Sequence, residues 1–339
     1  MHDLAVIIVS TNEGRWLRRC LATVFERAGV IDFDVVVVDN DSTDETRELV
    51  SGEFPSARVV WSRNLGFSHA NNRGVMTTNA RYVLFLNPDT EVVEGTFEEL
   101  VRALDERPAV GLAGVRQVTA DGELFPTIRR FPNALRAYAE ALGSERFPFR
   151  AAWLGERELD LELYEQEVPC DWTSGSFMIA RREALESGGF LDERFFIYSE
   201  ETDLCYRIKL AGWEIRHLPL MTIIHHADKA GINPKMEAQN AFTRLQYARK
   251  HFSPAHRVLY MGGVALRYVL RATISGRDPE TSAARRRASL RALRVLTGRE
   301  QPPFGTPPHE AVSPREAGTS SVGVRGEDSE SQPAASARA

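Results

Sequence analysis

The chain has 339 residues, 43% of them hydrophobic, which is enough to bury one substantial core in one or two domains. Its formal net charge is -5, so the molecule as a whole does not attract nucleic acid, and we expect no nucleic-acid partner. The three cysteines, Cys20, Cys170 and Cys205, are widely spaced without a C-x-x-C pair, which argues against zinc or redox chemistry and favours reduced thiols in packing positions.

The N-terminus is typical of a strand and not of a secretory leader, because Asp3 precedes an apolar run that already ends at Ser10. A long apolar stretch at 258–274 is interrupted by Arg267 and Arg271, so it falls short of the roughly 18 continuous apolar residues that span a bilayer. We therefore expect a cytoplasmic protein.

The first hundred residues alternate short apolar runs with segments of helix length. The runs are 4–9, 35–38, 58–61 and 82–86. Continuous apolar runs suit parallel strands that helices cover on both faces, so this rhythm predicts an α/β fold with a mostly parallel sheet. Apolar residues at helical spacing predict a first crossover helix over 15–27, and a second helix should start at Ser42 or Thr43.

Polar residues cluster directly after three of these predicted strands, at 11–13, 39–44 and 87–89. An open parallel sheet binds its ligand outside the carboxyl ends of the strands. We therefore expect the three clusters to lie along one edge of the sheet and to form a binding site.

The rest of the chain is less regular. Two extended pieces between 110 and 128 flank Asp121-Gly122, a hairpin signal, and 130–168 shows no clear periodicity. Further predicted elements are a strand at 172–179, a helix at 199–211, strands at 214–218 and 221–225, and helices at 235–251, 254–275 and 280–297. From 300 to 339 large apolar residues are scarce, which predicts a disordered tail.

Seven short segments, in this order, resemble family 2 glycosyltransferases with the GT-A fold, and most of all their rhamnosyltransferase-like branch. The segments are Ser10-Thr-Asn-Glu13, 38–44 (VDNDSTD), 64–74 (NLGFSHANNRG), 86–89 (LNPD), 171–176 (DWTSGS), 188–196 (GGFLDERFF) and 199–207 (SEETDLCYR). The resemblance covers about 4–226. It implies a Rossmann-like central sheet flanked by helices, with a nucleotide-binding half over about 1–115 and an acceptor and catalytic half over about 116–235. An Arg-rich helical region, 236–299, and the tail, 300–339, lie beyond it.

The same resemblance implies an inverting transfer of a sugar, with rhamnose as first choice, from a nucleotide-diphosphate donor. Thymidine diphosphate is the leading nucleotide and uridine diphosphate the second. The acceptor would be a hydroxyl of a lipid-linked molecule or a polysaccharide in envelope glycan synthesis, and the alternative is a nucleotide-sugar-binding scaffold without turnover. Donor contacts are expected from Thr11, Asn12, Glu13, Asp39, Asn40, Ser42, Asn64, Gly66, Asn71 and Asn87.

A divalent metal, Mg or Mn, is also implied. Asp89 stands where the family carries its D-x-D metal motif, although Asn87 replaces the first acid. Oxygen ligands suit these hard cations, which would stabilise the charge on a departing diphosphate. The second metal ligand of the family corresponds to His225 or to its neighbour His226, and the sequence leaves both open.

The acceptor hydroxyl requires a base, and the family carries it in an acidic pair that opens a helix. That pair corresponds to Glu200-Glu201, with Glu201 as the base where the family usually has Asp, and Asp203 as a neighbouring catalytic candidate. The alternative is that these acids only stabilise the positive helix end. The resemblance also implies that the acceptor and the donor sugar contact Trp172, Ser174, Gly175 and Asp192, although Trp172 is equally typical of a core residue.

The helical region 236–299 is rich in arginine between apolar residues, with Arg285, Arg286 and Arg287 in succession. Such a surface suits contact with anionic lipid, which would place the protein peripherally at the inner face of the plasma membrane. A solvated helix face or a dimer contact explains the same pattern equally well.

Overall fold

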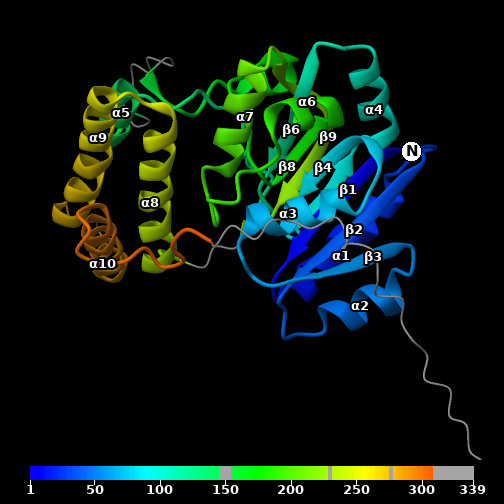
Figure 1. The fold of residues 1–339 in the computed structure, drawn as a ribbon, viewed down its shortest axis with the longest axis horizontal. Helices are drawn as coiled ribbons and strands as arrows, with labels where there is room; N and C mark the ends of the chain where they lie inside the picture. The colour runs from blue at the N-terminus through cyan, green and yellow to red at the C-terminus, as the bar shows by residue number, and fades with distance from the viewer. Residues whose placement is uncertain (145–153, 228–230, 275–277, 308–339) are drawn as a thin grey trace, which may run out of the picture.

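The structure is a computed structural model that describes residues 1–144, 154–227, 231–274 and 278–307 (Figure 1). At its centre lies one sheet in which the strands follow the order β3-β2-β1-β4-β8-β6-β9-β5, and β7 pairs with β9. The strands are β1 His2–Ser10, β2 Phe33–Asn40, β3 Ala57–Ser62, β4 Ala80–Leu86, β5 Thr90–Glu94, β6 Val110–Val118, β7 Val168–Pro169, β8 Phe177–Arg181 and β9 Glu214–His225.

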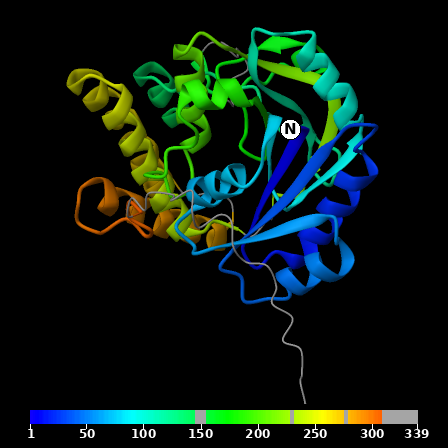
Figure 2. The same cartoon turned by 45° about the vertical axis from the view of Figure 1, so that its right-hand side comes forward.

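Helices flank the sheet. They are α1 Gly14–Glu26, α2 Thr46–Glu53, α3 Phe67–Met76, α4 Phe97–Asp105, α5 Ala134–Ala141, the 3-10 helix η3 Leu161–Glu165, α6 Arg182–Gly188, α7 Glu200–Leu210, α8 Pro234–His251, α9 Pro254–Thr273 and α10 Pro279–Leu296. Figures 1 and 2 place α5, α8, α9 and α10 together beside the sheet, beyond α7.

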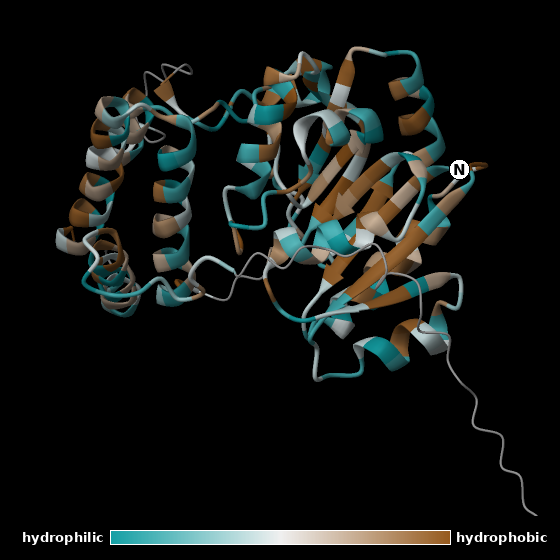
Figure 3. Cartoon of the chain, viewed as in Figure 1, coloured by the Kyte–Doolittle hydropathy of each residue, from teal (hydrophilic) through white to brown (hydrophobic). Residues whose placement is uncertain are grey.

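The apolar runs of the first half form the predicted parallel strands. Ile7 of β1 lies opposite Val36 of β2 and Phe85 of β4, and all three side chains are fully buried. The strands are accordingly the most hydrophobic part of the chain in Figure 3. Antiparallel pairing enters where β8 joins β4, so the sheet is parallel from β3 to β4 and mixed beyond it. The Asp121-Gly122 hairpin signal corresponds to a turn in which Gly122 has φ +79°.

Two predicted boundaries are wrong for local reasons. The second helix starts at Thr46, because the side chain of Asp44 accepts hydrogen bonds from the Thr46 amide and hydroxyl and keeps the preceding residues in a loop. The strand predicted at 172–179 starts only at Phe177, because Trp172 forms an isolated antiparallel bridge with Arg129. The predicted strands 214–218 and 221–225 form one strand, β9.

The three C-terminal helices are confirmed almost residue for residue. Each begins with proline, directly after Asn233, Ser253 or Asp278, whose side chain accepts a hydrogen bond from a first-turn amide. The α5 helix packs closely on α9, since a Cβ at Gly263 would lie only 2.8 Å from the Cβ of Ala137.

Residues 300–307, which we predicted as the start of a disordered tail, return to the sheet domain instead. Phe304 stacks on Phe196 with ring centroids 4.2 Å apart, and its amide donates to Gln239. The remainder of the predicted tail, 308–339, lies outside the described residues.

Candidate active site

A cavity of about 470 Å³ opens at the carboxyl ends of β1, β2 and β4. The structure brings many of the predicted site residues into its wall. They are Thr11, Glu13, Asn40, Asn64, Asn87, Asp89, Ser174, Gly175, Glu200, Glu201 and His225. Because these residues come from the ends of several strands and from two loops of the second half, the cavity joins the predicted donor and catalytic sides.

Three of the predicted donor contacts do not line the cavity and instead bind the loops that form its wall. Asn12 has φ +58°, and its side-chain oxygen accepts from the Thr43 amide at 2.7 Å. Asp39 is fully buried; it accepts from the Ser42 amide at 2.9 Å and pairs with Arg47. The Ser42 hydroxyl accepts from the Asn12 amide at 3.0 Å. Asn12, Asp39 and Ser42 thus fix the two loops that carry Thr11, Glu13 and Asn40, and their contact with a donor stays a prediction.

Gly66 holds the loop before α3 against the loop before α7. Its φ is +106°, and a Cβ at this position would lie 2.5 Å from the carbonyl oxygen of Phe196. The neighbouring Phe67 amide donates to that same oxygen at 2.6 Å. Asn71, another predicted donor contact, is buried and donates to the Phe67 carbonyl, so it supports this junction and does not line the cavity.

The structure separates the two adjacent histidines. His225 lines the cavity, and its Nε2 lies 3.5 Å from Oδ2 of Asp89. His226 points elsewhere: its Nε2 lies 2.7 Å from Glu91, and its ring stacks on Trp16. Burial raises the pKa of Asp89, but the hydrogen bond and the charge of His225 outweigh it and leave this pKa below its usual value.

Asp89 and His225 are the residues that could hold a cation. Among the described residues no group of three or more His, Cys, Asp or Glu side chains could do so alone. The buried Nδ1 of His225 has no hydrogen-bond partner, and both side chains face the cavity. This donor set fits Mg or Mn, which take few protein ligands and complete their shell with water and substrate phosphate.

The acidic pair follows a strained stretch of backbone. Tyr198 and Ser199 have φ +72° and +68°, a region that costs a residue other than glycine about 1–2 kcal/mol. The α7 helix then starts with Glu200 and Glu201, and Oε2 of each is buried without a hydrogen-bond partner in the part of the chain that the structure describes. An unpartnered carboxylate oxygen in a cavity is suited to accept a proton from a substrate hydroxyl.

The environment of the pair also favours proton transfer. Burial raises the pKa of Glu200 well above its usual value, and the negative charge of Glu201 adds to this effect. Burial likewise raises the pKa of Glu201, whereas backbone hydrogen bonds and the positive charge of Arg129 oppose it. Both glutamates are therefore harder to ionise than an ordinary glutamate, and the Arg129 charge favours the ionised form of Glu201.

Two predicted site acids lie outside the cavity. Asp203 is fully buried and binds Arg207 at 2.8 Å, His251 at 2.6 Å and Lys250 at 2.7 Å. Asp192 binds the same lysine at 2.6 Å. Both acids attach the second half of the domain to α8, and the catalytic role of Asp203 and the acceptor role of Asp192 stay predictions.

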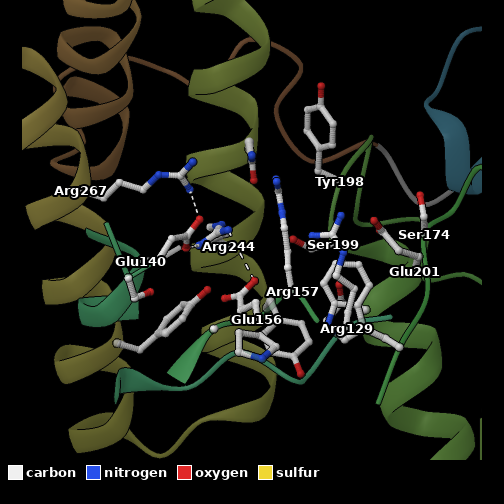
Figure 4. Close-up of a pocket in the computed structure, with 18 residues that line it drawn as sticks. Arg129, Glu140, Glu156, Arg157, Ser174, Tyr198, Ser199, Glu201, Arg244 and Arg267 are labelled. Atoms are coloured by element: carbon white, nitrogen blue, oxygen red, sulfur yellow. Dashed lines mark hydrogen bonds and ion pairs between the residues drawn. The ribbon is translucent and has the colours of Figure 1, made fainter. Parts of the chain in front are cut away.

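Trp172 lines a second cavity that adjoins the first. Its indole N–H donates to the Arg130 carbonyl at 2.9 Å, and the Arg129 guanidinium lies over its ring at 5.1 Å. The two cavities share Ser174, Tyr198 and Glu201. Figure 4 shows this second cavity, with Arg129 and Arg157 near Glu201 and with Glu140, Glu156, Arg244 and Arg267 on its far side.

Sequence reasoning missed several lining residues. Phe196 and Tyr198 stand in or beside segments that the family resemblance includes, but as largely apolar side chains they carried no chemical signal. Phe304 lay in the predicted tail, and Arg129 and Arg157 flank or fall within the aperiodic stretch. The only available signal was the density of arginine in this part of the chain.

The family model described as glycosyl transferase family 2 matches residues 5–188, more than half of the chain. This chain belongs to that family. It is 30% identical over 315 residues to an N-acetylglucosaminyl-diphospho-decaprenol L-rhamnosyltransferase of Mycobacterium tuberculosis, a match that covers 87% of this chain and 98% of the relative. It is 23% identical over 237 residues to the rhamnosyltransferase WbbL of Escherichia coli, over 66% of this chain and 83% of that one.

Among solved structures, a mannosyltransferase from Pyrobaculum calidifontis in complex with GDP-Man and Mn2+ matches with a TM-score of 0.51 and 15% identity, over 88% of both chains. This likeness confirms the predicted GT-A fold. The family 2 membership confirms that the chain is a glycosyltransferase, an enzyme that transfers sugars. None of its described helices combines the length and apolarity needed to cross a bilayer.

The strained entry to α7 is testable by substitution. Ser199→Gly should be more stable than Ser199→Val by about 1–2 kcal/mol, because glycine tolerates a positive φ and a β-branched residue does not. Thermal unfolding of both variants measures the difference. Equal unfolding temperatures would show that Ser199 does not adopt the left-handed conformation.

Proposed function

We propose that this family 2 glycosyltransferase transfers rhamnose, with inversion, from thymidine-diphosphate rhamnose to a hydroxyl of an N-acetylglucosamine that a diphosphate links to a lipid. The observation that carries the proposal is the unpartnered Oε2 of Glu201, which lies where the donor cavity meets the second cavity. The names of the Mycobacterium tuberculosis relative and of WbbL support rhamnose as the sugar and, for the former, the diphosphate-linked lipid acceptor. Uridine diphosphate is the second candidate nucleotide, and a polysaccharide the second acceptor.

The donor would occupy the first cavity. Thr11, Glu13, Asn40 and Asn64 line its N-terminal side and offer hydroxyl, carboxylate and amide groups to a base and a ribose. This arrangement follows from the parallel strands, whose carboxyl ends meet at one edge of the sheet. The diphosphate would then lie toward Asp89 and the sugar toward Ser174 and Gly175.

Glu201 would act as the base. Its carboxylate takes the proton of the acceptor hydroxyl while the hydroxyl oxygen forms a bond to the anomeric carbon of the donor sugar. The bond between that carbon and the phosphate oxygen breaks, and its electron pair leaves with the nucleotide diphosphate. Because attack comes from the face opposite the leaving group, the anomeric configuration inverts.

Asp89 and His225 would hold the divalent cation. When bound, Mg or Mn would stabilise the negative charge that develops on the departing diphosphate. The mannosyltransferase from Pyrobaculum calidifontis, whose structure is a complex with GDP-Man and Mn2+, supports a metal in this fold.

A lipid-linked acceptor requires contact with a membrane surface. The α5 and α9 helices and the residues directly after them carry large exposed hydrophobic side chains, among them Leu135, Leu142, Val258, Leu259 and Ile274. Arg286 and Arg287 of α10, which follow these residues in sequence, are exposed. Arg267 pairs with Glu140 and Arg271 with Glu237, so these two arginines are less available to lipid head groups. We propose peripheral binding through these apolar residues and the α10 arginines.

A transfer assay distinguishes the proposed transferase from the alternative, a nucleotide-sugar-binding scaffold without turnover. Thymidine-diphosphate rhamnose, uridine-diphosphate glucose and uridine-diphosphate galactofuranose are each offered with N-acetylglucosamine linked through a diphosphate to a short isoprenyl chain, and products are measured by mass spectrometry. We expect transfer from the rhamnose donor, and a loss of about 10²-fold or more in kcat for Glu201→Gln with donor binding retained. Saturable donor binding without any product would instead establish the scaffold.

The pH dependence of kcat should report the buried base. Because the pKa of Glu201 is raised by burial, the base is ionised above that pKa, and activity falls as the pH decreases through it. The acid limb should therefore lie above the ordinary range of a glutamate. Arg129→Gln should move it to still higher pH, since the Arg129 charge lowers this pKa. An acid limb that Arg129→Gln leaves unmoved would contradict the assignment, and Arg249→Gln, an exposed change on α8, is the control.

Substitution of His225 and substitution of His226 should have different effects on metal binding. In thermal-shift measurements with thymidine diphosphate, added Mn should stabilise the wild-type protein, because a ligand that binds only the folded state raises its stability. His225→Ala should abolish most of this Mn-dependent shift. His226→Phe, which keeps an aromatic ring against Trp16, should retain it. The opposite pattern would assign the metal to His226.

A further inference from the structure

Three cavities adjoin one another in the half of the molecule that would face the acceptor. The donor cavity and the second cavity share Glu201, as described above. The second cavity shares Glu140, Arg157 and Arg267 with a third, of about 580 Å³, between α5, α9 and α10. A continuous lining therefore leads from the proposed base to the edge of the C-terminal helices.

The chemistry of the lining changes along this path. Near Glu201 it is polar, with Ser174, Tyr198 and Ser199. The middle section of the lining is cationic and contains Arg129, Arg157, Arg244 and Arg267. The far section combines Leu142, Leu270 and Ile274 with charged residues such as Glu237, Arg271 and Arg285, and Leu142 and Ile274 are more than 60% exposed on the outer surface. From inside to outside the lining is thus polar, then cationic, and then gains large apolar side chains.

Arg244 and Arg267 of the middle section pair with glutamates. Arg244 lies 3.1 Å from Glu140 and 3.7 Å from Glu156, and Arg267 lies 2.6 Å from Glu140 (Figure 4). Burial raises the pKa of Glu140, but these two arginines outweigh it and bring the pKa to about 2, so Glu140 stays ionised. Arg244 and Arg267 therefore form the fixed wall of the section.

Arg129 differs from them. It forms no ion pair with any residue that the structure describes, and its buried Nε has no hydrogen-bond partner. Arg129 forms an isolated antiparallel bridge with Arg157, which places two arginines on neighbouring extended segments beside the same cavity. Burial, and then the positive charge of Arg157, lower the pKa of Arg129 to about 10. A buried cation next to another cation is costly unless an anion neutralises it.

We propose that Arg129 and Arg157 bind the diphosphate of the lipid-linked acceptor. The inference rests on the proposed function. Arginine suits this role because its planar guanidinium donates paired hydrogen bonds to phosphate oxygens. The order of the lining matches the order of the acceptor: the sugar lies at Glu201, the diphosphate at Arg129 and Arg157, and the lipid leaves past Leu142, Leu270 and Ile274.

Transfer kinetics test the inference with two acceptors. One is N-acetylglucosamine linked through a diphosphate to a short isoprenyl chain, and the other carries an alkyl chain of similar length without phosphate. Arg129→Gln and Arg157→Gln, assayed above the acid limb of the pH profile, should each raise the KM of the diphosphate acceptor about tenfold or more, since each 1.4 kcal/mol of lost binding is tenfold. The preference for the diphosphate acceptor should fall by the same factor, and Arg129→Lys should restore part of it.

Three results would overturn the inference. The KM of the diphosphate acceptor is unchanged in both glutamine variants, or the same loss appears in Arg249→Gln on the exposed side of α8, or the KM of the donor rises instead. The last result would assign the two arginines to the donor diphosphate.

A binding measurement decides the point even if no acceptor is glycosylated, which would be a failure of the proposed function alone. Calorimetry with farnesyl diphosphate, in the presence of saturating thymidine diphosphate to fill the donor cavity, should show binding to the wild-type protein. Both glutamine variants should bind it about tenfold more weakly. Equal affinity in the wild-type protein and the variants, or no binding at all, would reject the anion site.

Discussion

The catalytic arrangement depends on two glutamates at the start of α7, and among residues 1–144, 154–227, 231–274 and 278–307 neither Oε2 has a hydrogen-bond partner. Burying such groups costs free energy, as does the left-handed backbone of Tyr198 and Ser199 just before them. The same helix is fixed by Asp203, which binds charged side chains of α7 and α8. These ion pairs hold the helix start that carries the strained backbone and the two glutamates.

The C-terminal helices consequently have two roles. They anchor α7 through Asp203, and together with α5 they build the cationic section that adjoins Glu201. The sheet domain supplies the donor side from strand ends, while this helical layer supplies the acceptor side (Figure 1). The division explains how a widely used nucleotide-sugar fold gains a specific acceptor: the selective groups lie on the segment between β6 and β7, at the start of α7 and on the helices after the sheet.

The sequence predicted the strands of the first half and the last three helices well, because buried parallel strands need unbroken apolar runs and the helices carry proline and a capping side chain at their starts. It predicted the acidic pair and Asp89 through family resemblance. It did not distinguish Asn40, which lines the cavity, from Asp39, which fixes a turn, since short polar side chains serve both purposes. Arg129 was missed because its role arises from contacts with segments distant in sequence.

The central claim is that one cavity joins a diphosphate site at Asp89 and His225 to an unpartnered base at Glu201. A crystal structure of the chain with thymidine diphosphate and Mn tests it most directly. The account predicts the diphosphate beside Asp89 and His225, with open space between it and the Glu201 carboxylate where a sugar and an acceptor hydroxyl would meet. A diphosphate bound among Arg129 and Arg157, with Asp89 and His225 uninvolved, would contradict it.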